Sequence, residues 1–155
     1  MRKKCDHTSV GMLVWKGSEL LLIKRKRPPF GFAAPAGHVD GDSSYEIAAK
    51  RELKEEVGLE AVSLHLIQEE DISNQCYREG GTWHHWKVYE VRAEGGLEGS
   101  EAETIMVGWF TKEEIKKLAL RTQKYLTGEI AKEEWENSPG IEVVWYHLLM
   151  HLDLV

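Results

Sequence analysis

The stretch that decides the fold is RELKEEVGL at residues 51–59, which ends a segment rich in good helix formers. Ala49, Leu53 and Val57 recur every four residues, as expected for the buried side of a helix. Gly58 follows directly, and glycine is the residue type that most commonly ends a helix. The sequence therefore predicts an amphipathic helix over about residues 44–57.

The same stretch places three carboxylates on one side of that helix. Glu52, Glu55 and Glu56 stand at positions i, i+3 and i+4, which span an arc of about 100°. Like charges at these separations destabilise a helix by roughly 0.2–0.5 kcal/mol per pair. A solvent-exposed acidic face paired with Arg51 is the more common explanation of such a triplet taken alone. A bound Mg²⁺, which accepts carboxylate oxygens, is the functional alternative.

The residues around the triplet extend the pattern. Residues 37–59 resemble the Nudix box, which fixes Gly, Glu, Arg-Glu-apolar, Glu-Glu and Gly-apolar at set spacings. Eight of the nine specified positions match. They are Gly37, Arg51, Glu52, Leu53, Glu55, Glu56, Gly58 and Leu59. The preceding APAGHV at residues 34–39 and the later GWF at residues 108–110 also resemble the family. The resemblance covers about residues 10–120.

The resemblance implies an α/β fold, a Nudix-type α/β/α sandwich with a mixed β-sheet. It implies one domain over residues 1–155, with a helical segment over about 121–155 as part of it. The implied activity is metal-dependent hydrolysis of a diphosphate linkage in a nucleoside diphosphate derivative. A nucleoside triphosphate, a nucleotide sugar and a dinucleoside polyphosphate all remain open as substrates.

By the same resemblance, the metal ligands are the Gly37 carbonyl and the carboxylates of Glu52, Glu55 and Glu56, and the metal is Mg²⁺ or Mn²⁺. Arg51 would orient these carboxylates. An acidic residue outside the helix often completes such a site as ligand or base, and the candidates are Glu98, Glu101 and Glu103. Of these three we select Glu103.

One position departs from the box. Ser43 occupies the place of its first glutamate, and Asp42 could support Arg51 instead. Ser43 with Glu46 three residues later is also a capping-box pattern, which predicts that Ser43 caps the helix. The departure keeps open a catalytically weak nucleotide-binding or regulatory module on the same fold. A prenyl diphosphate isomerase shares the fold and is a third alternative, although its usual cysteine and glutamate context is not evident.

Other segments predict a hairpin, further strands and a helical end. Apolar runs separated by turn residues predict strands at 10–15, 19–23, 62–68 and 83–91, and Pro and Gly predict a loop over 28–42. Thr111 with Glu114 predicts a capped helix running to about residue 119. Further helices are expected near residues 122–136 and 141–152.

Several side chains are candidates for substrate binding. Arg25 and Arg27 end a strand before the box loop, where the family often places a phosphate-binding arginine, although charge on an edge strand explains them equally well. Candidates for nucleobase stacking are Phe30, Phe32, Trp83 and Trp86, although aromatic residues at strand spacing more often belong to the core. Tyr77 lies near where dinucleoside polyphosphate hydrolases of the family have a tyrosine.

Histidine and cysteine spacing gives no local metal motif. Cys5 and Cys76 form no CxxC pair, so neither a zinc ribbon nor a disulfide framework is predicted. His84 and His85 point to opposite faces of one strand and cannot act as a simple pair. The pair His147 and His151 has helical spacing for a metal, but without a carboxylate motif nearby a surface role is favoured.

Composition narrows the partners. The formal net charge is −6, yet residues 1–31 carry eight Lys and Arg side chains against two acidic ones. The negative net charge argues against non-specific nucleic-acid binding, although the charge is unevenly distributed along the sequence. No apolar run is long enough for a signal peptide or a membrane span, so we expect a cytoplasmic protein that acts on a small nucleotide-like molecule. A homodimer is possible by analogy with the family.

Overall fold

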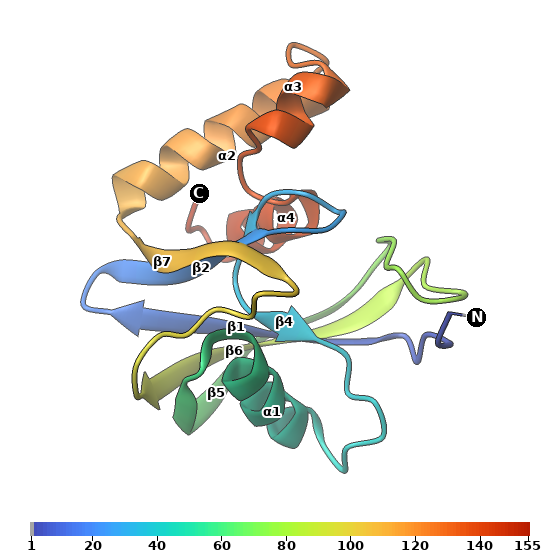
Figure 1. Ribbon diagram of the computed structural model, residues 1–155, viewed down its shortest axis with the longest axis vertical. Coiled ribbons are helices and arrows are strands. Elements are labelled where there is room, and N and C mark those ends of the chain that lie inside the picture. The colour runs from blue at the N-terminus through green and yellow to red at the C-terminus, as the bar shows by residue number, and fades with distance from the viewer. Residues whose placement is uncertain (1) are drawn as a thin grey trace.

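The computed structural model describes residues 2–155, and in them helices cover both sides of a β-sheet (Figure 1). The strands are β1 (Thr8–Lys16), β2 (Glu19–Arg25), β3 (Phe32–Ala33), β4 (Ala36–Gly37), β5 (Glu60–Ile72), β6 (His84–Glu94) and β7 (Thr104–Phe110). The helices are α1 (Tyr45–Val57), α2 (Lys112–Leu126), α3 (Lys132–Asn137) and α4 (Val143–His151). None of the helices in this part of the chain is both long and apolar enough to cross a membrane.

Strand β1 organises the sheet. It pairs in parallel with β6 over seven positions, from Thr8 opposite His85 to Val14 opposite Val91. It also forms the predicted antiparallel hairpin with β2 and pairs with the short strand β4, where Val10 lies opposite Gly37. Strand β5 extends the sheet beyond β6, while β3 and β7 flank β2. The predicted mixed sheet is therefore confirmed.

The core lies on both faces of β1 and β2. Residues 20–23 of β2 are almost completely buried, and a continuous apolar run is what a strand covered on both faces requires. Helix α1 packs against β1, β4 and β5, and Figure 1 shows α4 on the other side of the sheet. A side chain at Gly11 would lie 2.6 Å from the Trp145 ring, so this glycine allows α4 to approach β1 closely. The α/β/α sandwich predicted from the sequence is confirmed.

The start of α1 differs from the prediction. Ser44, not Ser43, caps the helix, because the Ser44 hydroxyl accepts a hydrogen bond from Ile47 N at 3.1 Å. Glu46 does not complete a capping box with Ser43. It accepts a hydrogen bond from the hydroxyl of the buried Tyr89 at 2.9 Å, which would otherwise lack a partner inside the protein. The predicted end is confirmed, since Gly58 adopts φ 78°.

The C-terminal helices also differ in their bounds. Thr111 and Glu114 form the predicted capping box, but α2 continues to Leu126 instead of ending near residue 119. No helix breaker stands between residues 119 and 126, and Gly128 with φ 83° follows the helix end. The predicted helix over 122–136 is therefore wrong, and only the short α3 forms in its second half. The predicted loop over 28–42 also contains β3 and β4.

Candidate active site

Helix α1 holds its carboxylates against the backbone of β4. A Cβ atom added to Gly37 would lie only 2.1 Å from Glu52 Cδ, so the absent side chain leaves room for this carboxylate. One helical turn later, Glu56 Oε2 accepts a hydrogen bond from Ala36 N at 3.2 Å. The box glycine and two box glutamates are therefore neighbours in space, although fifteen residues or more separate them in the chain.

Both of these carboxylates lie in an environment that penalises negative charge. Glu56 is only 4% exposed, and burial raises its pKa to about 8, with the charges of Glu52 and Glu103 adding to the effect. Burial also raises the pKa of Glu52 to about 7, although its hydrogen bond from Arg51 opposes this. Two carboxylates held together at such a cost fit a divalent cation, whose charge would favour their ionised forms.

Arg51 connects the helix to the loop that precedes it. Its Nε donates to Asp42 Oδ2 at 2.9 Å, and its Nη1 donates to Glu52 Oε1 at 2.8 Å and to Glu55 Oε2 at 3.3 Å. Its Nη2 donates to the carbonyl oxygen of His38 at 2.9 Å. One guanidinium therefore orients two carboxylates and fixes the loop, and Asp42 is one of its hydrogen-bond partners.

The edge between β2 and β7 brings two more predicted residues to the acidic face of α1. Arg25 pairs with Thr104 across these strands, and the backbone N–H of Lys26 donates to the Glu103 carbonyl at 2.9 Å. The charge of Glu103 raises the pKa of Glu52 and of Glu56, while Arg25 lowers that of Glu56. Glu103 and Arg25 therefore act through their charges on the buried carboxylates of α1.

The other acidic candidates contact this region through their backbone atoms. The Glu98 N–H donates to the carbonyl of Val57 at 2.8 Å, at the end of α1. The Glu101 carbonyl accepts from Lys26 Nζ at 3.2 Å. The loop after β6 is thus fastened to the last turn of α1, with Glu103 at its end.

The predicted substrate residues fall into two separate places. Arg27 is exposed beyond the end of β2, and Phe30 is half-buried in the loop that follows. Tyr77 and Trp83 belong instead to the connection between β5 and β6, where they are 79% and 43% exposed. The Trp83 ring stacks on His7 with centroids 4.3 Å apart. The structure therefore does not join these aromatic residues to the arginines in one cluster.

Two aromatic candidates belong to the core. Trp86 is buried and contacts Trp145 edge to face, with ring centroids 5.7 Å apart. Phe32 packs edge to face on Phe110 at 5.4 Å. The core interpretation that the sequence left open therefore holds for both side chains.

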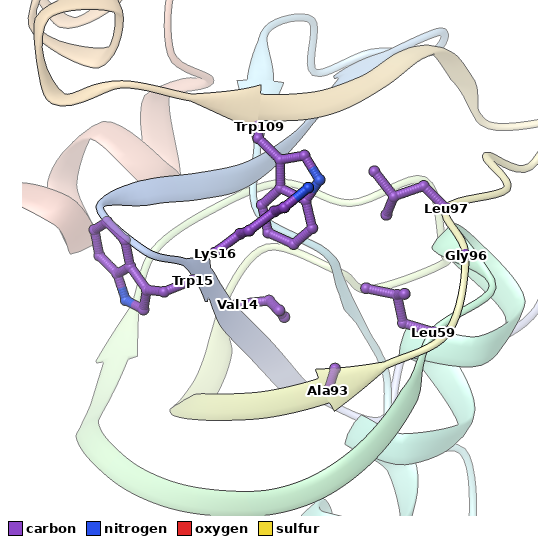
Figure 2. Close-up of a pocket in the computed structure, with 9 residues that line it drawn as sticks. Val14, Trp15, Lys16, Leu59, Ala93, Gly96, Leu97 and Trp109 are labelled. Carbon is purple, nitrogen blue, oxygen red and sulfur yellow. The ribbon is translucent and has the colours of Figure 1, made fainter.

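An open cavity of about 450 Å³ lies at the C-terminal end of β1 (Figure 2). Figure 2 shows Val14, Leu59, Leu97 and Trp109 around one hollow, with Lys16 beside the Trp109 ring. The Lys16 ammonium lies 5.8 Å from that ring centroid. The lining includes none of the predicted substrate residues, and it contains no carboxylate.

The sequence did not reveal two groups of metal-ligating side chains. In residues 2–155, two groups have ligand atoms that all lie within 4.8 Å of one another. One consists of Cys5, His38, Cys76 and His84, and the other of Glu70, His147 and His151. Neither group contains the glutamates of α1. The expectation that His147 and His151 lack a carboxylate was wrong, because Glu70 of β5 accepts from both rings at 2.8 and 3.0 Å. Only the tertiary fold unites these residues.

Comparisons with known proteins identify the family and the fold. The sequence model described as NUDIX domain matches residues 6–128. An ADP-ribose pyrophosphatase of Methanocaldococcus jannaschii is 45% identical over 53 residues, which is 33% of this chain but only 31% of that protein. The solved structure of a MutT NUDIX hydrolase from Burkholderia pseudomallei is 26% identical with a TM-score of 0.56, covering 69% of this chain and 84% of that one. A NUDIX family hydrolase from Clostridium perfringens shares the fold with a TM-score of 0.61 at 19% identity, covering 73% and 86%.

Proposed function

The chain belongs to the NUDIX domain family, and from this premise we propose that it is a Mg²⁺- or Mn²⁺-dependent hydrolase that cleaves a diphosphate linkage in a nucleoside diphosphate derivative. One observation carries the proposal. Glu52 and Glu56 are held against the backbone of β4 in surroundings that raise the pKa of both carboxyls. Such an arrangement is costly for a purely structural helix and useful for a cation site.

The proposed ligands are the Gly37 carbonyl and the carboxylates of Glu52, Glu55 and Glu56. A bound divalent cation would neutralise charge on the diphosphate and lower the pKa of an attacking water. Arg51 keeps Glu52 and Glu55 in place through hydrogen bonds of 2.8 and 3.3 Å. Glu103, which is exposed at the edge of the acidic face, is our candidate for a further ligand or a base that accepts the proton of water.

The substrate would approach between the acidic helix and the basic end of β2. Arg25 lowers the pKa of Glu56 through its charge, which supports a role for Arg25 in binding a phosphate of the substrate. Arg27 and Phe30 follow it in the chain and are proposed to bind phosphate and base. Tyr77 and Trp83 remain proposals for a more distant part of a longer substrate, because both are exposed.

Among the substrate classes, we place nucleoside diphosphate sugars of the ADP-ribose type first. The M. jannaschii relative named ADP-ribose pyrophosphatase supports this choice, although its matched part is short. Nucleoside triphosphates and dinucleoside polyphosphates complete the panel. The binding-only alternative rests on Ser43, and the hydrogen bond from Arg51 to Asp42 weakens it, because the arginine is supported without the usual glutamate.

The test incubates the purified protein with Mg²⁺ and each compound and separates the nucleotide products by chromatography. Glu55→Gln removes one proposed ligand while leaving the buried groups intact, and Glu113→Gln on the exposed start of α2 is the matched control. We expect turnover that depends on the metal, is lost in Glu55→Gln and persists in Glu113→Gln. Binding without turnover for every compound, a prenyl diphosphate included, would instead favour the regulatory module.

Two expectations about the cell biology stay predictions. We expect the enzyme to act in the cytoplasm and to form a homodimer. The C-terminal helices expose the apolar side chains Leu120, Leu126 and Met150, which is the kind of surface a second copy would cover. Light scattering after size-exclusion chromatography would give the mass of the particle, and a monomer mass would remove the dimer from the proposal.

A further inference from the structure

Four side chains from distant parts of the chain converge beside the sheet. They are Cys5 before β1, His38 after β4, Cys76 in the β5–β6 connection and His84 at the start of β6. From the geometry of this cluster, we propose that the protein carries a second metal centre, a structural Cys₂His₂ zinc site separate from the carboxylates of α1.

The distances match those of a tetrahedral zinc site. Cys5 Sγ lies 3.8 Å from Cys76 Sγ, 3.6 Å from His38 Nε2 and 3.4 Å from His84 Nε2. Zinc bonds of about 2.3 Å to sulfur and about 2.05 Å to nitrogen, at tetrahedral angles, give S···S near 3.8 Å and S···N near 3.6 Å. The sulfurs are too far apart for a disulfide, whose bond is about 2.05 Å. The three distances from Cys5 Sγ therefore match a tetrahedral zinc site, and all four ligand atoms lie within 4.8 Å of one another.

The imidazole of His84 is oriented for metal binding. Its Nδ1 donates to Asn74 Oδ1 at 3.0 Å, and Trp86 Nε1 donates to the same oxygen at 3.3 Å. With the proton on Nδ1, the lone pair of Nε2 points toward Cys5. A metal-binding histidine commonly has such a hydrogen bond on its other nitrogen, because the bond fixes both the tautomer and the ring.

The backbone is shaped around both sulfur atoms. The N–H of His7 donates to Cys5 Sγ at 3.3 Å, and the N–H of Arg78 donates to Cys76 Sγ at 3.4 Å. In each case the donor stands two residues after the cysteine, and such donors stabilise a thiolate. A Cβ atom at Gly81 would lie 2.1 Å from Cys76 Sγ, so glycine is required where the loop returns past the sulfur.

The chemistry of the donors selects zinc over the cation of the acidic site. Two sulfurs and two imidazoles suit Zn²⁺, whereas Mg²⁺ requires oxygen ligands. Cys5 and His84 are buried and the other two are half-buried, as expected for a closed structural site. The site would fasten the N-terminal segment, the box loop and the β5–β6 connection to one another.

The test measures zinc in the full-length protein, purified without an affinity tag that binds metal and dialysed against metal-free buffer. We expect about one zinc per chain, lost in Cys5→Ser and Cys76→Ser. Two controls should retain it: His65→Asn, which changes an exposed histidine of β5, and His147→Gln, which disrupts the group of Glu70. Raising free zinc to 100 times its Kd should raise the Tm of the zinc-free protein by about 5–10 °C.

Cobalt substitution provides a readout that is independent of activity and of variant folding. Co²⁺ bound to the wild-type chain should show the visible bands of a tetrahedral ion together with sulfur-to-metal charge transfer. The proposal fails if the wild-type chain retains no zinc and gives no such spectrum after reconstitution. It also fails if His147→Gln loses the metal while Cys76→Ser keeps it, or if the intact mass is lower by two hydrogens, which would reveal a Cys5–Cys76 disulfide.

Discussion

Replacing Glu56 by glutamine should separate the stability of the protein from its ability to bind magnesium. The carboxyl is 4% exposed and accepts one backbone hydrogen bond, from Ala36. Burial and the charges of Glu52 and Glu103 raise its pKa from 4.5 to about 8. Glutamine keeps the shape and the acceptor but carries no charge to desolvate. Glu56→Gln should therefore stabilise the magnesium-free protein at neutral and alkaline pH while weakening magnesium binding.

The magnitude follows from proton linkage. Between pH 4.5 and pH 8 the Glu56 carboxyl is ionised in the unfolded chain but keeps its proton in the folded protein. The free energy of unfolding of the wild type therefore falls as pH rises. Integrated to pH 7, this loss is about 3 kcal/mol. The added amide N–H₂ needs an acceptor, and leaving it unsatisfied costs about 1–2 kcal/mol. The net gain of Glu56→Gln at pH 7 is then about 1–2 kcal/mol, or a rise in Tm of roughly 2–8 °C.

Urea unfolding of both proteins in magnesium-free buffer at pH 5 and pH 8.5 tests this reasoning. Burial lowers the pKa of His38 and His84, which adds stability as pH rises toward 6.5, but that contribution is common to both proteins and cancels in their difference. The difference in unfolding free energy should shift by about 3–4 kcal/mol in favour of the variant between the two pH values. Parallel pH profiles would refute the argument. Added Mg²⁺ should stabilise the wild type more than the variant at pH 8.5.

Three further substitutions probe the same architecture. Gly37→Ala places a Cβ 2.1 Å from Glu52, so urea unfolding should show a loss of about 1–3 kcal/mol together with weaker Mg²⁺ binding, and unchanged values would contradict the close packing. In Arg51→Lys the side chain cannot hydrogen-bond Asp42 and Glu52 at once, so a magnesium titration should give a raised Kd. An unaltered Kd would show that these two hydrogen bonds of the guanidinium are dispensable. Trp145→Ala should cost about 3–5 kcal/mol in urea while kcat per folded molecule stays the same, and a selective loss of kcat would refute a purely packing role.

Local sequence signals predicted much of the fold. The helix around residues 51–59 followed from its four-residue repeat and its glycine end, and the β1–β2 hairpin followed from two apolar runs around a Gly-Ser turn. The cap was misplaced by one residue, because serine is an equally good cap at positions 43 and 44, and Glu46 bonds the Tyr89 hydroxyl instead of completing a box with Ser43. Periodicity locates an element, whereas its end depends on tertiary partners.

Long-range convergence could not be predicted from spacing. Cys5 and His84 stand 79 positions apart, and no CxxC pair draws attention to either cysteine. They meet because β1 pairs in parallel with β6, which places Thr8 opposite His85 and so brings the segment before β1 beside the start of β6. Parallel pairing between the first strand and the sixth leaves no signal in a local window. The placement of Glu70 beside the histidines of α4 was missed because these residues too are far apart in the sequence.

The residue that connects the two proposed metal sites is His38. Its carbonyl accepts from Arg51 Nη2 at 2.9 Å, which ties it to the carboxylates of α1, while its imidazole Nε2 faces Cys5 Sγ at 3.6 Å. Gly37, the neighbour that lies against Glu52, is therefore anchored on one side by the guanidinium and on the other by the cysteine cluster. Because the Gly37 carbonyl is a proposed ligand, loosening the cluster would displace a ligand without touching any carboxylate. Zinc would then act on hydrolysis through the position of the box loop.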